Sequence, residues 1–189
     1  MNYELFQAIN GPAGRWPAVD HVMQFAATYL IFGVFAVAAV VAGRALLQRR
    51  IRPVAGLGVT LGLAFGLAQL LAHASREMRP FQDHAVHQLI PHAPGVSLPS
   101  DHATAAFTLA FGVWLFLDRR AGMALTAAAA LIGLARVWCG VHYPGDILAA
   151  AVIAGLAALM VYVTDRGARE AASYGASESV GQGVPRSSE

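Results

Sequence analysis

The sequence contains no lysine and a single cysteine, and each shortage excludes a class of chemistry. All 13 basic residues are arginines, so no mechanism that depends on a lysine amine is available. Cys139 has no second cysteine within this chain with which to form a disulfide or a cysteine-built metal site. Charged residues are scarce as well, because 13% of the chain is charged and 57% is hydrophobic. This composition is too apolar for an ordinary soluble domain and predicts one membrane domain.

The basic sequence pI of about 9.0 does not indicate nucleic acid as a partner. Most arginines flank apolar segments, which is the usual topology signal of a membrane protein. We therefore expect the lipid bilayer as a partner and no nucleic acid, and the oligomeric state stays open. The segment MNYELFQAINGPAGRWPAVD lacks the basic-then-apolar order of a signal peptide, so we expect the first long apolar run to be kept as an anchor.

Apolar runs of the length of a membrane span recur along the chain. A spanning helix needs about 20 predominantly apolar residues. The runs cover residues 22–47, 54–73, 103–117, 121–135 and 147–164, and the third and fourth need adjoining polar turns to complete a crossing. Because backbone polar groups in hydrocarbon must be satisfied internally, we expect an all-α polytopic membrane helix bundle of about five transmembrane helices.

The distribution of arginine predicts the orientation. Three connections on one side of a five-span bundle hold Arg44, Arg49, Arg50, Arg52, Arg119, Arg120, Arg166 and Arg169. The positive-inside rule makes this side the cytoplasm. The amino terminus, the 74–100 loop and the 139–145 turn are then extracytoplasmic, and the carboxyl terminus is cytoplasmic.

Shorter elements complete the predicted map. Apolar residues at helical spacing favour an interfacial helix over residues 3–10, and a second such helix is expected over 82–90. From Gly167 onward the chain is rich in serine and glycine and short of apolar residues. This predicts an integral-membrane domain over 1–166 and a disordered cytoplasmic tail over 167–189.

Polar residues cluster at the predicted extracytoplasmic ends of the helices. They are Arg76, Glu77, Arg79, Ser100, Asp101, His102, Arg136, His142 and Asp146. Ionisable groups at membrane depth are costly, which makes them candidates for a functional site. Each has an ordinary alternative, because a lone arginine can anchor a helix end, Ser100 or Asp101 can simply cap a helix, and Asp146 can complement a helix dipole.

Taken together, these residues favour phosphate chemistry. Arg79, Arg136 and Ser100 can converge with the free N–H groups of a helix start on one phosphate. One histidine can attack phosphorus while another protonates the leaving oxygen. Asp146 stands four residues after His142, in position to fix its tautomer, which favours His142 as the nucleophile and His102 as the acid. Spacing alone leaves the opposite assignment open.

Three motifs then resemble a known family. They are RP at 79–80, PSDH at 99–102 and RVWCGVHYPGD at 136–146, and they resemble the signatures of the type 2 phosphatidic acid phosphatase superfamily. MNYELFQAING, RPFQDHAVHQLIPH and PSDH resemble, within it, the bacitracin-resistance undecaprenyl-diphosphatases of bacterial membranes. The resemblance extends to about Thr164.

The resemblance implies a role for each matching residue. His142 would form a phosphohistidine with Asp146 as its partner, and His102 would protonate the leaving lipid phosphate. Arg79, Ser100, the Asp101 backbone and Arg136 would bind the phosphate, with no metal or cofactor. The implied reaction is hydrolysis of undecaprenyl diphosphate at the outer face of the bacterial plasma membrane, which recycles the cell-wall lipid carrier and confers bacitracin resistance.

Two positions depart from the superfamily pattern. Ala72 stands where a lysine is usual, and Arg76, one helical turn before Arg79, could replace some of its charge. Asp101 stands where glycine is usual, so its side chain is expected to face outward. The loop histidines, His84, His87 and His92, could contact the diphosphate or tune the response to pH, although exposed interface residues are the simpler interpretation.

Two other functions fit parts of the pattern. The same fold could dephosphorylate phosphatidylglycerophosphate or phosphatidic acid, because nothing in the apolar residues distinguishes a polyprenyl chain from acyl chains. A non-catalytic bacitracin-immunity or transport protein would not need His102, His142 and Asp146 together. Five spans also do not divide into the two repeated halves from which many transporters are built.

Overall fold

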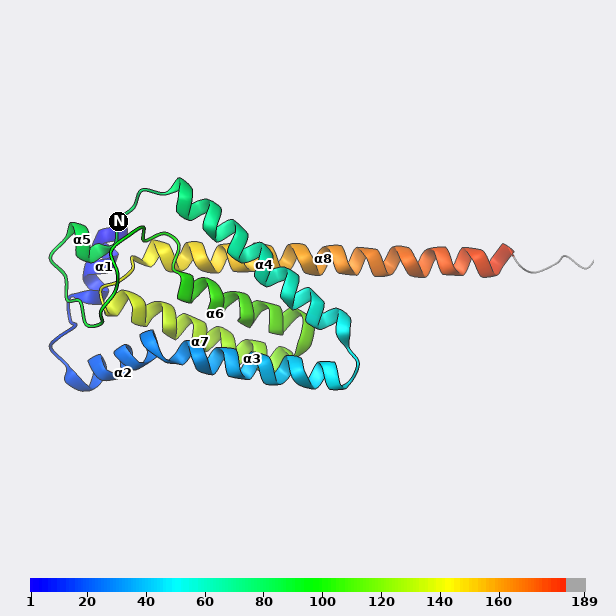
Figure 1. Cartoon of the computed structure of the whole chain (residues 1–189), viewed down its shortest axis with the longest axis horizontal. Helices are drawn as coiled ribbons and strands as arrows, with labels where there is room; N and C mark the ends of the chain where they lie inside the picture. Colours follow the sequence, from blue (N-terminus) through cyan, green and yellow to red (C-terminus); the bar gives the residue numbers. More distant parts are fainter. Residues whose placement is uncertain (183–189) are drawn as a thin grey trace, which may run out of the picture.

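The computed structural model describes residues 1–182. Over this range the chain is helical and without strands, apart from one isolated bridge between Met78 and Val96. The elements, shown in Figure 1, are α1 (Asn2–Asn10), α2 (Pro17–Thr28), α3 (Leu30–Leu47), α4 (Ile51–Ala74), α5 (Pro80–Asp83), α6 (Asp101–Gly112), the π-helical η1 (Val113–Leu117), α7 (Arg119–Trp138) and α8 (Pro144–Gln182). The predicted all-α class is confirmed.

Within the described residues, four helices are long and apolar enough to cross a membrane: α3, α4, α7, and α8 over Pro144–Ser173. A shorter apolar helix, Asp101–Leu117, combines α6 and η1. Large apolar side chains such as Phe32, Leu70 and Leu148 are exposed on these helices, as expected of a surface that faces lipid. The chain is therefore a multi-pass membrane protein built from about five spans.

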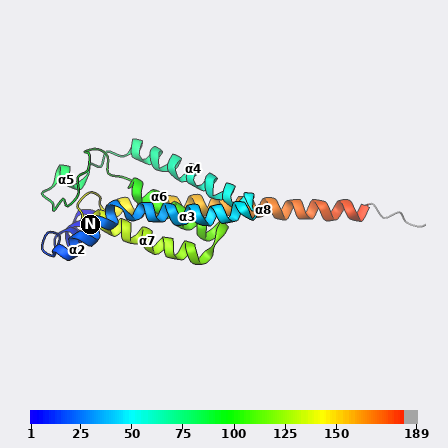
Figure 2. The same cartoon turned by 60° about the horizontal axis from the view of Figure 1, so that its bottom comes forward.

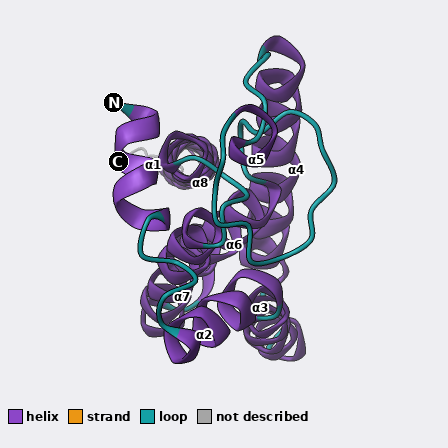
Figure 3. Cartoon of the chain, turned by 90° about the vertical axis from the view of Figure 1, so that its left-hand side faces the viewer, coloured by secondary structure: helices purple, strands orange, loops and turns teal. Residues whose placement is uncertain are grey.

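Helix α6 lies at the centre of the bundle. Every residue from 103 to 110 is buried, most of them alanine or threonine. Figure 3, a view along the bundle, shows α6 enclosed by α3, α4, α7 and α8, and α6 packs on all four. Small side chains allow this close approach. The start of α6 is thereby held rigidly at one end of the bundle.

The first predicted span, 22–47, is divided in the structure. Tyr29 separates α2 from α3, with φ of −112° and ψ of −25°. Two hydrogen bonds to Asp20 fix α2 near its start, because Trp138 Nε1 donates to Oδ1 at 2.9 Å and the Gly14 N–H donates to Oδ2 at 3.1 Å. Side-chain contacts of this kind set the direction of α2, and apolar length alone could not predict them.

The predicted helix over 82–90 is wrong beyond its first residues, because α5 ends at Asp83. Two backbone N–H groups of the segment that follows bond to other elements. The His87 N–H donates to Oδ1 of Asn10 at 3.0 Å, and the Leu89 N–H donates to the carbonyl of Cys139 at 3.1 Å. These contacts replace the helical hydrogen bonds and hold the loop over the bundle end.

Helix α8 continues to Gln182, past the predicted end of the membrane domain at residue 166, and the division into a membrane domain and a disordered tail stays a prediction. Figure 1 shows α8 extending well beyond the bundle. Helix α4 crosses the bundle obliquely, and its carboxyl-terminal end lies away from α3 (Figure 2). Ion pairs at helical spacing support the extension, with Arg166 bonded to Glu170 at 3.0 Å and Arg169 paired with Asp165. The last part of the predicted tail, 183–189, lies outside the described residues.

Candidate active site

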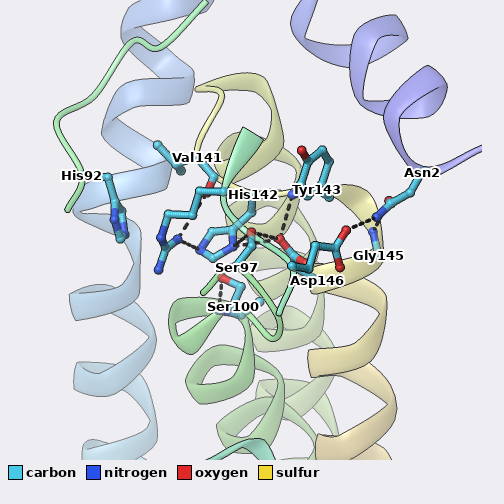
Figure 4. A network of polar contacts seen from close by, with 12 residues as sticks. Asn2, His92, Ser97, Ser100, Val141, His142, Tyr143, Gly145 and Asp146 are labelled. Carbon is cyan, nitrogen blue, oxygen red and sulfur yellow. Dashed lines mark hydrogen bonds and ion pairs between the residues drawn. The ribbon is translucent and has the colours of Figure 1, made fainter. Parts of the chain in front are cut away.

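The predicted site residues other than Arg76 gather at one end of the bundle, where α6 and α8 begin and α7 ends (Figure 1). The 75–100 segment between α4 and α6 passes over the same end and brings Arg79, His92 and Ser97 with it. Figure 4 shows His142 and Asp146 at the middle of a polar network that includes Ser97.

A tight turn between α7 and α8 places His142, of which only 1% is exposed. Gly140 permits the turn because its φ of 78° lies in the left-handed region. A Cβ at Gly140 would also stand 2.7 Å from the carbonyl oxygen of His87. Pro144 suits the first position of α8, since its φ is already helical and its missing N–H is not needed there. Asp146 consequently falls in the first turn of α8.

Asp146 holds the His142 ring by one oxygen. Oδ2 lies 3.0 Å from Nδ1 of His142, accepts the Tyr143 N–H at 2.8 Å and accepts the Ser97 hydroxyl at 2.5 Å. An ionised carboxylate can only accept, so the ring proton resides on Nδ1 and Nε2 keeps its lone pair. Asp146 is thus placed to orient His142, and its catalytic role stays a prediction.

Ser97 belongs to this network although the sequence did not single it out. Its side chain is fully buried, and Oγ also lies 3.4 Å from Nδ1 of His142. The Ser97 N–H donates to the carbonyl of Glu77 at 2.8 Å, which ties two parts of the loop together. In the sequence, the signal that could have identified Ser97 was its closeness to the PSDH motif. The sequence of a loop has no periodicity that predicts such a contact.

Arg79 approaches the opposite edge of the imidazole. Its Nη1 donates to Nε2 of His142 at 2.9 Å and to the carbonyl of Val141 at 3.3 Å. The Gln82 side chain accepts the Arg79 N–H at 3.3 Å and the Gly95 N–H at 2.8 Å, which fixes the loop around it. A guanidinium can only donate, so this contact independently places the lone pair on Nε2.

Arg136 is buried in the last turn of α7, with 3% of the residue exposed. Its Nη1 donates to the carbonyl of Ala27 at 3.4 Å. Its Nε and Nη2 atoms, like Nε of Arg79, are buried without a partner within the described residues. Buried N–H groups are normally satisfied, so these unpartnered donors suit an anionic ligand, and their role in binding phosphate stays a prediction.

The first residues of α6 face the same region. Ser100 is buried, its Oγ accepts the Ala103 N–H at 3.5 Å, and its own N–H donates to the carbonyl of Asp146 at 3.5 Å. The hydroxyl proton of Ser100 and the helix start are available to an anion. The side chain of Asp101 is exposed and that of His102 is half-buried.

Arg76 is not brought into the cluster. Helix α4 ends at Ala74 and the chain is extended at Ser75, so Arg76 is not one helical turn from Arg79 as the sequence suggested. Its side chain is exposed. The structure therefore offers no support for Arg76 as a substitute for the lysine absent at Ala72.

Helix α1 fastens the loops around the site. The Asn2 side chain donates to Oε1 of Glu77 at 3.0 Å and accepts the Gly145 N–H at 3.0 Å. Asn10 donates to the carbonyls of His87 at 2.9 Å and Trp138 at 2.7 Å. Burial, followed by the nearby charge of Asp146, raises the pKa of Glu77. A helix thus forms over the predicted range 3–10 and supports the site, and its location in the membrane interface stays a prediction.

The environment of His142 favours the neutral imidazole. Burial lowers its pKa well below the ordinary value of 6.5, the positive charges of Arg136 and Arg79 lower it further, and protonation of His92 or His102 would act in the same direction. A neutral imidazole retains its nucleophilic lone pair. The ring is therefore neutral at neutral pH, and its role as a nucleophile stays a prediction.

Within the part of the chain that the structure describes, no three His, Cys, Asp or Glu side chains gather closely enough to hold a metal ion. The Cys139 thiol is buried, and this burial raises its pKa to about 11. The thiol consequently stays protonated at neutral pH and is a poor nucleophile. Metal independence stays a prediction.

A protein-family model identifies the superfamily of the chain. Residues 53–169, more than half of the 189-residue chain, match the model of the PAP2 superfamily. The chain belongs to the PAP2 superfamily. The matched region contains every predicted site residue of this PAP2 protein, whereas α1, α2 and α3 precede it.

Relatives are similar over most of this PAP2 chain. Undecaprenyl-diphosphatase BcrC of Bacillus subtilis (strain 168) is 36% identical over 156 residues, which cover 82% of this chain and 79% of the relative. Bacitracin transport permease protein BcrC of Bacillus licheniformis is 28% identical over 165 residues, which cover 87% and 80%. The crystal structure of Aquifex aeolicus LpxE superposes with a TM-score of 0.66 at 26% identity and covers 85% of this chain and 93% of that chain.

These similarities, together with the apolar helices, make the protein a membrane-embedded PAP2 phosphatase. The region before the family match still contributes to the site. Asn2 and Asn10 from α1 support the loops, and the carbonyl of Ala27 from α2 bonds to Arg136.

Proposed function

We propose that this protein hydrolyses undecaprenyl diphosphate to undecaprenyl phosphate and inorganic phosphate through a phosphohistidine at His142. The strongest support is the orientation of the ring, whose Nδ1 lies 3.0 Å from Asp146 and whose Nε2 lies 2.9 Å from the Arg79 guanidinium. The lone pair therefore faces a group suited to binding phosphate. The 36% identical relative named an undecaprenyl-diphosphatase supports the choice of substrate.

Arg136 and Arg79 bind the terminal phosphate in this proposal. The unpartnered Nε and Nη2 of Arg136 and Nε of Arg79 supply buried donors for phosphoryl oxygens. Nη1 of Arg79 moves its hydrogen bond from Nε2 of His142 to a phosphoryl oxygen as the substrate binds. The Ser100 hydroxyl and the start of α6 add further donors.

In the first chemical step, Nε2 of His142 attacks the terminal phosphorus. An N–P bond forms, the bond from this phosphorus to the bridging oxygen breaks, and the electron pair stays on undecaprenyl phosphate. His102, which takes up a proton from solvent as the anionic substrate binds, donates this proton to that oxygen. Asp146 stabilises the positive charge that develops on the His142 ring.

In the second step, water attacks the phosphorus of the phosphohistidine. His102, now neutral, accepts a proton from this water, the N–P bond breaks and the electron pair returns to Nε2 of His142. Inorganic phosphate is released, and both histidines regain their starting protonation states. The two steps together consume one water for each diphosphate.

The proposed location is the bacterial plasma membrane, with the site on the extracytoplasmic side. Arg44, Arg49, Arg50 and Arg52 lie at the end of α3 and the start of α4, at the opposite end of the bundle from His142 (Figure 1). The positive-inside rule assigns the arginine-rich end to the cytoplasm. Release of the lipid carrier outside the cell would then supply the substrate, and its turnover would confer bacitracin resistance.

The decisive assay measures phosphate release by purified protein in detergent with EDTA. Undecaprenyl and farnesyl diphosphate are compared with phosphatidic acid and phosphatidylglycerophosphate. We expect metal-independent release from the polyprenyl diphosphates, loss of activity in His142→Ala, and inhibition by orthovanadate, which mimics the five-coordinate phosphorus. Full activity in His142→Ala would exclude the phosphohistidine.

The same assay separates the competing functions. Faster hydrolysis of the phosphatidyl substrates would assign a glycerolipid phosphatase. A protein that released no phosphate from any of them, yet protected cells from bacitracin, would match the permease named in Bacillus licheniformis. The convergence of Arg79 and Asp146 on one imidazole favours catalysis, because binding or export alone has no need of an oriented nucleophile.

Cysteine labelling in intact cells tests the orientation. Ala85→Cys lies in the exposed loop at the site end, and Gln48→Cys lies in the exposed turn at the other end. Cys139 is buried and gives little background. An impermeant maleimide should label position 85 and not position 48, and the reverse pattern would overturn the proposed topology.

A further inference from the structure

His92 stands beside the proposed nucleophile, although the sequence favoured an exposed interface residue. Its ring centroid lies 6.0 Å from that of His142, with the planes at 80°. The side chain is half-buried and comes from the loop before α6 (Figure 4). The other loop histidines lie elsewhere, because His84 stacks on Tyr3 at 3.8 Å and His87 is exposed.

A hydrogen bond to the backbone defines the tautomer of His92. Its Nδ1 lies 3.0 Å from the carbonyl oxygen of Ala93. A carbonyl can only accept, so Nδ1 carries a proton. In the neutral ring, Nε2 then has a lone pair, which repels an anion. Only a second proton, on Nε2, makes His92 a donor to phosphate.

The permanent positive charges that act on His92 are those of Arg79 and Arg136, which are few for the negative charge of a bound diphosphate. Groups that act on its charge or face it across the site are Arg79, Arg136, Asp101, His102 and His142. Burial lowers the pKa of His92, the Ala93 carbonyl opposes this, and the two arginines lower the pKa further. A bound diphosphate reverses the sign of the local charge and therefore favours the protonated ring.

We propose that His92 is a phosphate-binding residue, which takes up one proton from solvent as the diphosphate binds and then donates from Nε2 to a phosphoryl oxygen. The proposal rests on the proposed function, because it assigns a further residue to the same phosphate site. Binding, and not the chemical step, is the event that His92 assists. The proton is lost again when inorganic phosphate leaves.

Steady-state kinetics on farnesyl diphosphate across the pH range test this role. Loss of a charge-assisted hydrogen bond should raise KM about tenfold in His92→Ala and change kcat far less. The rise of KM with pH in the wild type should be shallower in His92→Ala. His92→Arg, which has a permanent charge, should restore a low KM without the pH dependence.

His87→Ala is the matched control, since His87 is an exposed histidine of the same loop whose bonds to Asn10 use only its backbone. It should retain the wild-type KM at every pH. A His92→Ala variant with wild-type KM and wild-type pH dependence would rule out the proposed role. Thermal unfolding in detergent verifies that each variant is folded.

Calorimetry separates this proposal from the proposed function, because it needs no turnover. Orthovanadate is titrated into the protein in two buffers of different ionisation enthalpy, which gives the number of protons taken up on binding. Wild type should take up about one proton more than His92→Ala or His92→Arg. A wild type that binds vanadate without proton uptake would refute the role of His92, even if hydrolysis of diphosphate were demonstrated.

Discussion

Nδ1 of His142 lies 3.0 Å from Oδ2 of Asp146, its neighbour four residues along the chain. The same Oδ2 receives the Ser97 hydroxyl and the Tyr143 N–H, whereas Oδ1 is buried without a partner among the described residues. Three donors on one oxygen restrict the carboxylate to a single orientation. The imidazole is restricted with it, and its Nε2 is directed toward Arg79.

Asp146→Asn preserves the shape of this side chain and removes its negative charge. We expect kcat to fall on the order of 10³-fold, because the amide can no longer stabilise a positively charged His142 ring or secure its tautomer. KM should change little. Phosphate release measured beside the remote Asp165→Asn variant checks this, and near-normal turnover in Asp146→Asn would contradict an orienting role.

The acidic limb of the pH profile should reflect the lowered pKa of His142. The neutral ring is the nucleophile, and a lower pKa keeps it neutral as the pH falls, so kcat/KM should decline only well below pH 6.5. Arg79→Gln removes one positive neighbour and should move this limb toward higher pH, whatever its effect on the absolute rate. A wild-type limb at or above 6.5 would show that burial and the arginines do not control this group.

Ser97→Ala tests a residue that the sequence did not reveal. It removes the 2.5 Å hydrogen bond to Oδ2 of Asp146 and leaves the backbone contacts in place. Activity should drop about ten- to hundredfold, the usual effect of losing a hydrogen bond to a charged group. The exposed Ser173→Ala serves as the control in the same assay, and equal rates for the two variants would remove Ser97 from the site.

Gly122→Ala tests the close packing of α7 on η1. A Cβ at this position would overlap the main chain of Trp114, so the helices must separate. The expected destabilisation is about 1–3 kcal/mol, measured by thermal unfolding in detergent. Gly58→Ala on α4, where a Cβ meets nothing within 4 Å, should be neutral or slightly stabilising. Similar unfolding temperatures for both variants would argue against tight contact.

Much of the architecture follows from local properties of the sequence. Runs of about 20 apolar residues specify helices because the bilayer leaves backbone groups no other partners. The spacing of His142 and Asp146 likewise predicts their contact, because Pro144 starts a helix and Asp146 in its first turn can reach back to a residue just before it. Ionisable residues at the ends of apolar helices favour a functional site because charge at membrane depth is costly.

The sequence by itself therefore determined the membrane class, the helical spans and the pairing of His142 with Asp146. Only the tertiary structure decided the parts that depend on loops. It divided the first span at Tyr29, left Arg76 exposed, and brought Ser97 and His92 to the imidazole. Loop residues have no helical period, and their positions follow from hydrogen bonds to distant partners such as Asn10 and Cys139, which exist only once the helices have packed.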